Sequence, residues 1–349
     1  MRLVKFGRTG LFVSELALGT MTFGGEGIWK GIGGLCQKDA EMLIGLAVDA
    51  GVNLIDTADV YAAGESEIIV GAAIRNLQLP RDSLVVATKA MADTGRGPNA
   101  QGTSRYHLMN AVKASLVRLQ LDHVDIYQLH GFDPATSIEE SLRALDRLVQ
   151  DGLVRYVGVS NWAAWQIAKA LGIAARLGLS PLDSLQAHYT IAARDLEREI
   201  VPMLQSEGLA LMVWSPLAGG ILSGKYPRDG MAESGSRRNG FDFPPINRDR
   251  VFACIDVMAS MAESRGASTA QIALSWLLHQ PVVTSVIVGA RRPEQLQECV
   301  GAAGVQLTPS ELEVLEAIAP PPAEYPGWIL DMVGWGRQNL LRDSASRMK

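Results

Sequence analysis

The feature that most constrains the fold is an alternation of short apolar runs with longer amphipathic segments, repeated eight times along the chain. Short apolar runs are typical of buried parallel strands, and apolar residues at three- and four-residue spacing are typical of helices packed on one face. Repeated strand–helix units of this kind predict a parallel sheet covered by helices. The predicted strands are residues 16–18, 54–56, 84–88, 124–129, 156–159, 184–186, 210–214 and 286–288.

Helical patterns follow these strands, and their ends carry the expected capping residues. Ser137 precedes a segment with acidic residues in its first turn, and Gly152 follows its end, which suits an N-cap and a left-handed C-terminal residue. Eight parallel strands separated by helices close into a barrel, whereas an open doubly wound sheet usually has fewer strands. We therefore predict an α/β fold, a (β/α)₈ barrel. The predicted helices are residues 40–49, 65–75, 106–119, 138–150, 165–177, 196–207, 269–279 and 293–299.

Three segments depart from this alternation. A hairpin that turns at residues 7–10 is expected before the first strand. A long loop rich in Gly, Pro, Arg and Asp, residues 219–250, follows the seventh strand and leads into an extra helical run at 251–264. Loops of this length are usually functional. We predict one domain over residues 1–349, in which the irregular tail 319–349 lies over the mouth of the barrel.

Composition excludes several classes of function. The 349 residues carry a net charge of −5, so no basic field supports nucleic-acid binding. No uncharged apolar run is long enough to span a bilayer, and the first residues do not resemble a secretory signal. The three cysteines show no metal-binding or disulfide spacing, which suits a reducing compartment. We expect a cytoplasmic protein without a metal, a nucleic-acid partner or a membrane partner; oligomerisation is left open.

Polar residues follow three consecutive predicted strands. Asp56 ends the second strand and Tyr61 lies in the loop after it, Lys89 follows the third strand, and His130 follows the fourth. Because the carboxyl ends of barrel strands converge on one face, we expect these four side chains to meet. Each residue alone also fits a structural role, such as a helix cap or a core ring, but four together at three strand ends favour a catalytic site.

The residue types indicate acid chemistry at a carbonyl. A nearby ammonium favours the phenolate, so Lys89 is expected to lower the pKa of Tyr61, and Asp56 to keep Lys89 protonated. A neutral His130 would orient a substrate carbonyl while Tyr61 gives it a proton. Nothing in this group donates hydride, so the chemistry requires an organic cofactor.

The sequence resembles the aldo-keto reductases from residue 1 to about residue 318. The resemblance implies a (β/α)₈ barrel that carries out NADPH-dependent reduction of aldehydes or ketones, with Tyr61 as the acid and Asp56, Lys89 and His130 as its partners. Residues 95–105 and 220–226 are most similar to the bacterial aryl-alcohol-dehydrogenase-like and channel β-subunit-like branch. The matching motifs are residues 56–61 (DTADVY), 87–89 (ATK), 129–130 (LH), 158–161 (GVSN), Gln186 with Tyr189, 214–217 (WSPL) and 289–298.

The resemblance also implies a cofactor track. Ser160, Asn161 and Gln186 would hold the nicotinamide carboxamide, and Trp214 would stack under the ring. The pyrophosphate would lie against the backbone after that strand, where glycines permit close approach. The remaining implied cofactor contacts are Ser215, Leu217, Gly219, Leu222, Gly224, Lys225, Gly289, Gln295 and Glu298.

The cofactor preference follows from the residues before the last predicted helix. Free N–H groups at a helix start, together with Arg291, suit a ribose 2′-phosphate, which favours NADP over NAD. Cys299 stands where many family members have Asn. Trp29 and Phe132, with aromatic residues of the tail, would form an apolar mouth for aryl or medium-sized carbonyls.

Other functions would also use some of these residues or nearby glycines. Residues 219–226 nearly match a phosphate-binding P-loop, but Tyr226 stands in the Ser/Thr position and Pro227 disfavours the helix that should begin there. No Gly-x-Gly-x-x-Gly fingerprint is present. Two alternatives stay open: a barrel aldolase with Lys89 as Schiff-base nucleophile, and a β-subunit-like regulator that binds the cofactor and turns over slowly.

Overall fold

A computed structural model of the chain describes residues 1–25, 28–95, 97–229, 236–330, 332–334, 337 and 339. Eight parallel strands close into a barrel in sequence order, and the last pairs with the first. Each predicted strand overlaps one of these, so the predicted barrel is confirmed; that residues 1–349 form one domain stays a prediction. The strands are β3 Leu16–Gly19, β4 Leu54–Asp56, β5 Val85–Ala90, β6 Val124–Leu129, β7 Val154–Ser160, β8 Ser184–His188, β9 Ala210–Trp214 and β10 Val283–Val288.

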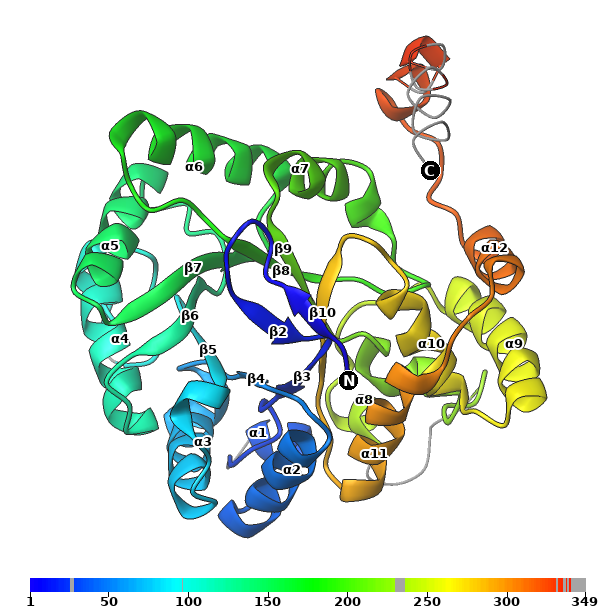
Figure 1. The fold of residues 1–349 in the computed structure, drawn as a ribbon, viewed down its shortest axis with the longest axis horizontal. Helices are drawn as coiled ribbons and strands as arrows, with labels where there is room; N and C mark the ends of the chain where they lie inside the picture. The colour runs from blue at the N-terminus through cyan, green and yellow to red at the C-terminus, as the bar shows by residue number, and fades with distance from the viewer. Residues whose placement is uncertain are drawn as a thin grey trace.

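Helices surround the barrel (Figure 1). The Ser137 hydroxyl accepts a hydrogen bond from the Glu140 N–H at 3.2 Å, which caps the fourth predicted helix at the expected residue. The sixth begins later than predicted, because residues 195–197 form a separate 3₁₀ turn. The main outer helices are α2 Gln37–Asp49, α3 Glu65–Asn76, α4 Arg105–Leu119, α5 Ile138–Gln150, α6 Ala164–Leu177, α7 Ile200–Glu207, α10 Thr269–Leu278 and α11 Pro293–Gly301.

Side chains fill the inside of the barrel, and a hairpin closes its N-terminal end. The predicted hairpin is present as β1 (Leu3–Lys5) and β2 (Phe12–Ser14), which lie across the barrel in Figure 1. Phe6 and Val13 of this hairpin belong to the inner apolar cluster, together with inward residues of the strands. Because this end is filled by apolar side chains, polar groups gather at the opposite end of the strands.

Extra elements follow β9, as the sequence predicts. A 3₁₀ turn leads from the barrel to the short helix α8 (Arg237–Gly240) and then to α9 (Arg248–Arg265). The short helix α1 (Ile28–Ile32), from the loop after β3, contacts α8. These two helices therefore meet over the polar end of the barrel although they lie far apart in sequence.

The C-terminal tail does not lie over the barrel mouth in the part that the structure describes. After α12 (Pro309–Ile318) the chain runs outward, away from the barrel (Figure 1). Tyr325 and Trp328 are 78% and 52% exposed and contact each other at a ring distance of 6.4 Å. The expectation is therefore wrong for these residues, because their rings pair locally rather than pack on the mouth. Residues 331, 335, 336, 338 and 340–349 of the predicted tail lie outside the described residues.

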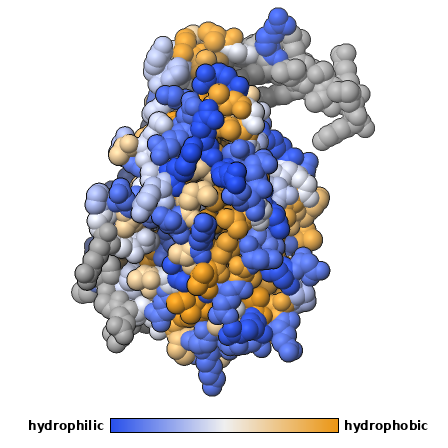
Figure 2. All heavy atoms as spheres, turned by 90° about the vertical axis from the view of Figure 1, so that its left-hand side faces the viewer, coloured by the Kyte–Doolittle hydropathy of each residue, from blue (hydrophilic) through white to orange (hydrophobic). Residues whose placement is uncertain are grey.

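The outer faces of α3 to α6 carry both charged and apolar side chains. Figure 2 shows this side of the molecule, where apolar atoms gather in the lower half of the view among hydrophilic ones. Ile68 of α3 and Val117 of α4 are 47% and 78% exposed. Apolar atoms make up more than half of a typical folded surface, so these side chains alone do not identify a partner. Among the described residues, no helix is long and apolar enough to cross a membrane.

Close packing of α3 on α4 gives a test of the helical layer. A methyl group on Gly71 of α3 would lie 2.2 Å from the Leu119 carbonyl oxygen, so Gly71→Ala forces the helices apart. We expect it to lower the free energy of unfolding by about 1–3 kcal/mol in urea titrations. Gly172→Ala in α6 is the matched control, because its methyl group meets no described atom within 4 Å. That variant should be neutral or gain up to about 1 kcal/mol; equal losses would contradict this account of the packing.

Candidate active site

One cavity of about 630 Å³ lies at the carboxyl ends of the barrel strands. It runs from the loops after β3 and β4 to the segments after β9 and β10, so it brings together most residues that the sequence singled out. The predicted site residues that line it are Trp29, Asp56, Tyr61, His130, Ser160, Asn161, Gln186, Trp214, Ser215, Leu217, Gly219, Lys225, Gly289, Arg291, Gln295 and Glu298.

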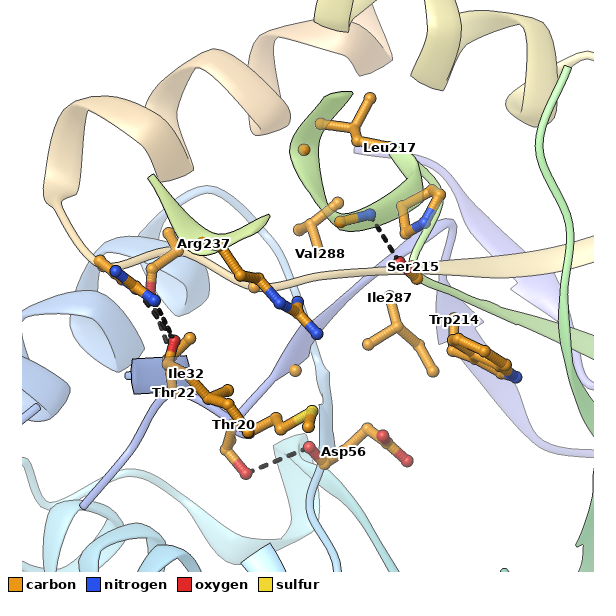
Figure 3. Close-up of a pocket in the computed structure, with 18 of the residues that line it drawn as sticks. Thr20, Thr22, Ile32, Asp56, Trp214, Ser215, Leu217, Arg237, Ile287 and Val288 are labelled. Carbon is orange, nitrogen blue, oxygen red and sulfur yellow. Dashed lines mark hydrogen bonds between the residues drawn. The ribbon is translucent and has the colours of Figure 1, made fainter. Parts of the chain in front are cut away.

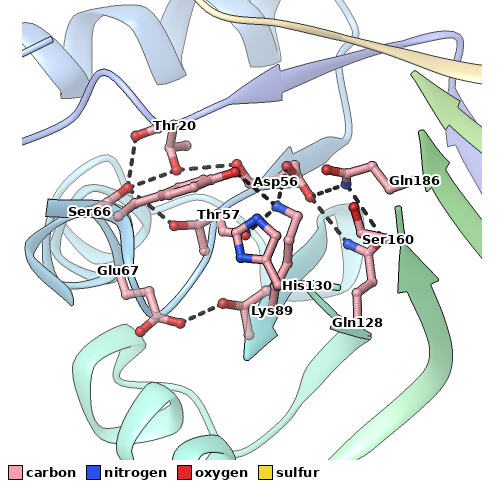
Figure 4. Close-up of polar contacts among 12 residues, drawn as sticks. Thr20, Asp56, Thr57, Ser66, Glu67, Lys89, Gln128, His130, Ser160 and Gln186 are labelled. Atoms are coloured by element: carbon pink, nitrogen blue, oxygen red, sulfur yellow. Dashed lines mark hydrogen bonds and ion pairs between the residues drawn. The ribbon is translucent and has the colours of Figure 1, made fainter. Parts of the chain in front are cut away.

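Lys89 lies at the centre of the polar groups, just beneath the cavity (Figure 4). Its ammonium is fully buried and donates to the Asp56 carboxylate at 2.7 Å and to the Thr57 carbonyl at 2.7 Å. A third, longer bond runs to the Tyr61 hydroxyl at 3.4 Å. An ammonium has three N–H donors, so these partners satisfy Lys89 completely.

Backbone bonds between the loop after β4 and strand β5 hold Tyr61 beside Lys89. The Thr57 N–H donates to the Ala87 carbonyl at 2.9 Å, and the Asp59 N–H donates to the Lys89 carbonyl at 3.1 Å. The chain then turns sharply, because the next residues after Tyr61, Ala62 and Ala63, adopt left-handed backbone conformations. The start of the loop therefore continues the pairing of β4 with β5.

Burial and charge act against each other on this group. Burial raises the pKa of the Tyr61 phenol, and the Lys89 ammonium opposes that effect without reversing it. Lys89 does lower the pKa of Tyr61, as predicted, but desolvation of the phenolate is the larger effect, so that pKa lies above its ordinary value. Burial disfavours the Lys89 ammonium too, but the Asp56 carboxylate raises the pKa of Lys89 above its ordinary value.

His130 lies beside Tyr61 at the end of β6. The ring centroids are 5.8 Å apart and the ring planes stand at 75°. Burial and the Lys89 charge lower the pKa of His130 to about 3, so the imidazole is neutral. Its buried Nδ1 has no hydrogen-bond partner among the described residues. This neutral imidazole beside the phenol matches the arrangement predicted from the strand ends.

Two glutamines inside the barrel hold the other Asp56 oxygen. The Gln186 side-chain amide of β8 donates to Asp56 Oδ1 at 2.9 Å, and that of Gln128 in β6 does so at 3.4 Å (Figure 4). Sequence reasoning missed Gln128, although it stands two residues before His130 and so faces the same side of the sheet. Gln186 thus contacts Asp56 and also lines the cavity.

A second group of side chains forms the wall at the ends of β7 and β9. The Trp214 indole N–H donates to the Asn161 side-chain oxygen at 3.0 Å. The Asn161 amide donates to the Ser160 hydroxyl at 3.0 Å and to the His130 carbonyl at 3.3 Å. Asn161 adopts a left-handed backbone conformation, which turns its amide toward this wall. One face of Trp214 stacks on Phe243 at 5.7 Å.

The turn after β9 is closed by hydrogen bonds among its own residues. Gly219 and Gly220 take left-handed conformations, yet their N–H groups already bond to Ser215 and Leu217 within the turn. The Leu222 side chain is fully buried in the core, and neither Leu222 nor Gly224 lines the cavity. The N–H groups of these two residues bond within the turn, and their cofactor contacts stay a prediction.

The far end of the cavity carries Arg291. Its guanidinium donates to the carbonyls of Gly31 and Ile32, both at the end of α1, with a shortest distance to Ile32 of 2.7 Å. The Gln295 side chain accepts the Arg291 N–H at 2.9 Å and so holds the start of α11. Arg291 thus links α11 to α1 across the cavity as well as lining it.

Arg237 and Phe243 of the long loop line the cavity although sequence reasoning missed them. Arg237 of α8 points into the cavity toward the side that holds Thr20 and Asp56 (Figure 3), and its buried Nε has no hydrogen-bond partner among the described residues. The neighbouring Arg238 instead bonds to the carbonyls of its own loop. The Arg–Arg pair was a visible signal, but the sequence does not show which member points inward.

The two predicted substrate contacts differ in position. Trp29 lines the cavity, and its ring lies 6.2 Å from the Tyr61 ring. Phe132 is not among the lining residues; it packs edge-on against Trp162 at 5.2 Å. Phe132 therefore packs on the aromatic residues after β7, and its contact with substrate stays a prediction.

Comparisons with known proteins agree with this geometry. The aldo/keto reductase family model matches residues 15–320, and the chain belongs to the aldo/keto reductase family. It is 38% identical to the probable voltage-gated potassium channel subunit beta of Arabidopsis thaliana, over 91% of this chain and 96% of that protein. It is 34% identical to the versiconal hemiacetal acetate reductase of Aspergillus parasiticus, over 94% of this chain and 99% of that protein. Membership of this family supports an oxidoreductase.

The buried Lys89–Asp56 pair gives a test that does not depend on activity. Lys89→Met leaves the Asp56 carboxylate buried without its cation, so we expect the free energy of unfolding to fall by about 3–5 kcal/mol in urea titrations. Adding Asp56→Asn removes the stranded charge and should restore part of the loss. A loss below about 1 kcal/mol in the single variant would show that the pair is not buried as described.

Proposed function

We propose that this protein is an NADPH-dependent oxidoreductase that reduces aldehydes or ketones, aryl compounds among them, to alcohols. The observation that carries the proposal is the Tyr61 hydroxyl at the cavity wall, hydrogen-bonded from behind by a fully buried Lys89 and flanked by a neutral His130. A protonated phenol and a neutral imidazole facing one cavity suit a carbonyl oxygen that must be oriented and then protonated.

The residues of the cavity fit a phosphate-rich dinucleotide. Arg237, Arg291, Arg292 and Lys225 line it and supply four positive charges. The buried Nε of Arg237 has no described hydrogen-bond partner, although a buried guanidinium normally binds an anion. When bound, NADPH would supply the hydride that no side chain provides. The amides of Asn161 and Gln186, with the Trp214 ring, would hold its nicotinamide end.

The residues of the tetrad would then perform the proton chemistry. The imidazole of His130 donates a hydrogen bond to the substrate oxygen and sets its position in front of Tyr61. Tyr61 gives its proton to that oxygen, and the Lys89 ammonium stabilises the phenolate that is left. Asp56 keeps Lys89 charged and directed at Tyr61. Trp29 and Trp214, which line the cavity, would exclude water from this position.

Removal of the phenol hydroxyl tests the assigned acid. We expect Tyr61→Phe to keep NADPH affinity within about threefold, because the ring and the cavity remain, and to lower carbonyl reduction by roughly 10²–10⁴-fold. Fluorescence titration with NADPH measures the first, and NADPH absorbance with a panel of aldehydes and ketones measures the second. A variant that reduces carbonyls at the wild-type rate would refute the role of Tyr61.

The preference for NADPH over NADH is tested at Arg291. Loss of a charged hydrogen-bond donor to a phosphate costs about 1.5–3 kcal/mol, so Arg291→Ala should weaken NADPH binding roughly 10–100-fold and leave NADH binding nearly unchanged. Arg176→Ala, at an exposed position of α6 outside the lining of the cavity, is the matched control. Equal losses for both cofactors would mean that Arg291 acts only by holding the carbonyls at the end of α1.

A second candidate is a regulatory subunit that binds the cofactor and turns over slowly. The similarity to potassium channel β subunits of Arabidopsis thaliana and Oryza sativa, at 38% and 37% identity, favours keeping it. Tight NADPH binding without NADPH consumption over a carbonyl panel would support this function. A Schiff-base aldolase is disfavoured, because Lys89 does not line the cavity and the pKa of its ammonium is raised.

A further inference from the structure

A buried polar cluster lies on the outer side of the barrel wall, directly behind the active site. Successive side chains of a strand point to opposite faces, so Lys89 faces the barrel interior and Thr88 faces the helices α3 and α4. Thr88 donates to Glu67 of α3 at 2.5 Å (Figure 4), and Arg118 of α4 donates to the same carboxylate at 2.6 Å. The cluster also includes Asp59, from the loop that carries Tyr61.

The partners in this cluster are unevenly distributed. Glu67 is fully buried and both of its oxygens accept hydrogen bonds, from Thr88 and Arg118. Asp59 is only 2% exposed, and neither of its carboxyl oxygens has a partner among the described residues. The buried Tyr127 hydroxyl of β6 has none either. An ionised Asp59 would therefore be a second negative charge beside Glu67, desolvated and without a bonded cation.

The charges around Asp59 favour its neutral form. Burial raises the pKa of the Asp59 carboxyl to about 7, and the Glu67 carboxylate adds to this effect, while Arg118, the nearby Val60 backbone N–H and Lys89 oppose it. Tyr127 on the facing strand stays neutral, because burial, Asp59 and Glu67 all raise the pKa of its phenol.

Asp59 is also a point of attachment for the catalytic loop. Its N–H donates to the Lys89 carbonyl at 3.1 Å, two residues before Tyr61. The Tyr61 N–H in turn bonds to the Ala58 carbonyl at 3.2 Å. The side chain of Asp59 thus lies buried in the outer cluster, while its backbone N–H holds the loop that carries Tyr61 against β5.

We propose that Asp59 is a positioning residue for Tyr61, whose buried carboxyl must carry its proton for the loop to stay seated against β5. When Asp59 ionises, repulsion from Glu67 and the need for water displace the loop, and the Tyr61 hydroxyl moves away from Lys89. Carbonyl reduction then stops, while the affinity for the cofactor is unaffected.

 The predicted cofactor residues lie at the ends of β7, β8 and β9 and after β10, whereas Asp59 lies behind β5.

The proposal rests on the proposed reductase function for its kinetic test and on folding alone for a second test. The kinetic test follows NADPH oxidation with 4-nitrobenzaldehyde from about pH 6 to about pH 8.5. If only the protonated form is active, a group with a pKa of about 7 gives a loss of roughly 30-fold in kcat over this range. The NADPH dissociation constant should stay constant. A limb from Tyr61 itself would lie at higher pH, because burial raises the pKa of that phenol above its ordinary value of 10.0.

Asp59→Asn keeps the shape of the protonated carboxyl and removes its titration. We expect this variant to reduce the aldehyde at a rate that changes less than about threefold over the same range. Asp183→Asn is the matched control, since burial also raises the pKa of Asp183, to about 6, but this residue precedes β8 at the opposite end of the barrel. Its kcat profile should keep the wild-type fall. A flat wild-type profile, or the same fall in Asp59→Asn, would overturn the proposal.

Thermal unfolding gives the second test, without substrate or cofactor. The folded-state pKa of Asp59, about 7, lies above its ordinary value of 3.8, so the folded protein holds a proton that the unfolded chain has lost. The contribution of Asp59 to the free energy of unfolding should therefore fall as pH rises between about 4 and 7 and level off above that. The melting temperature of Asp59→Asn should fall less than that of the wild type over this window. Parallel curves would overturn the proposal even if no aldehyde were reduced, and an absence of NADPH oxidation at every pH would count against the reductase function alone.

Discussion

The buried ion pair between Lys89 and Asp56 is the interaction on which the rest of the site depends. A fully desolvated ammonium is tolerated only when every N–H finds an acceptor, and Lys89 finds three: the Asp56 carboxylate, the Thr57 carbonyl and the Tyr61 hydroxyl. Asp56 is the last residue of β4, and Thr57 and Tyr61 belong to the loop that follows it. The demand of one buried charge therefore fixes where the loop after β4 must run.

The barrel wall divides the polar groups of this region into two layers. Inside the barrel, the side-chain amides of Gln128 in β6 and Gln186 in β8 donate hydrogen bonds to Asp56 Oδ1. Outside the wall, Glu67 is held by Thr88 and Arg118. Strand β5 belongs to both layers, because its successive residues face opposite sides. A change in the outer layer can therefore reach the inner one through a single strand and its attached loop.

The sequence predicted the parts of the molecule that periodicity and strand ends determine. Apolar runs gave the eight strands, and the rule that barrel strands end on one face brought Asp56, Lys89 and His130 together. The sequence could not predict which arginine of the long loop points into the cavity. Arg237 and Arg238 are adjacent and chemically identical, and the contact of α8 with α1 arises only in the folded chain. The tail was misplaced for a related reason: Tyr325 and Trp328 contact each other, and no motif in the sequence shows this local contact.

The direction of the Tyr61 pKa shows why charge alone was not enough. An adjacent ammonium stabilises a phenolate, but the same burial that makes this interaction strong removes water from the phenolate, and the second effect is larger. A phenol that keeps its proton at neutral pH is what a proton donor requires. Lys89 then acts chiefly as the proton leaves, when negative charge develops 3.4 Å from its ammonium. The depth of the site, rather than its net charge, sets the protonation state from which the reaction would start.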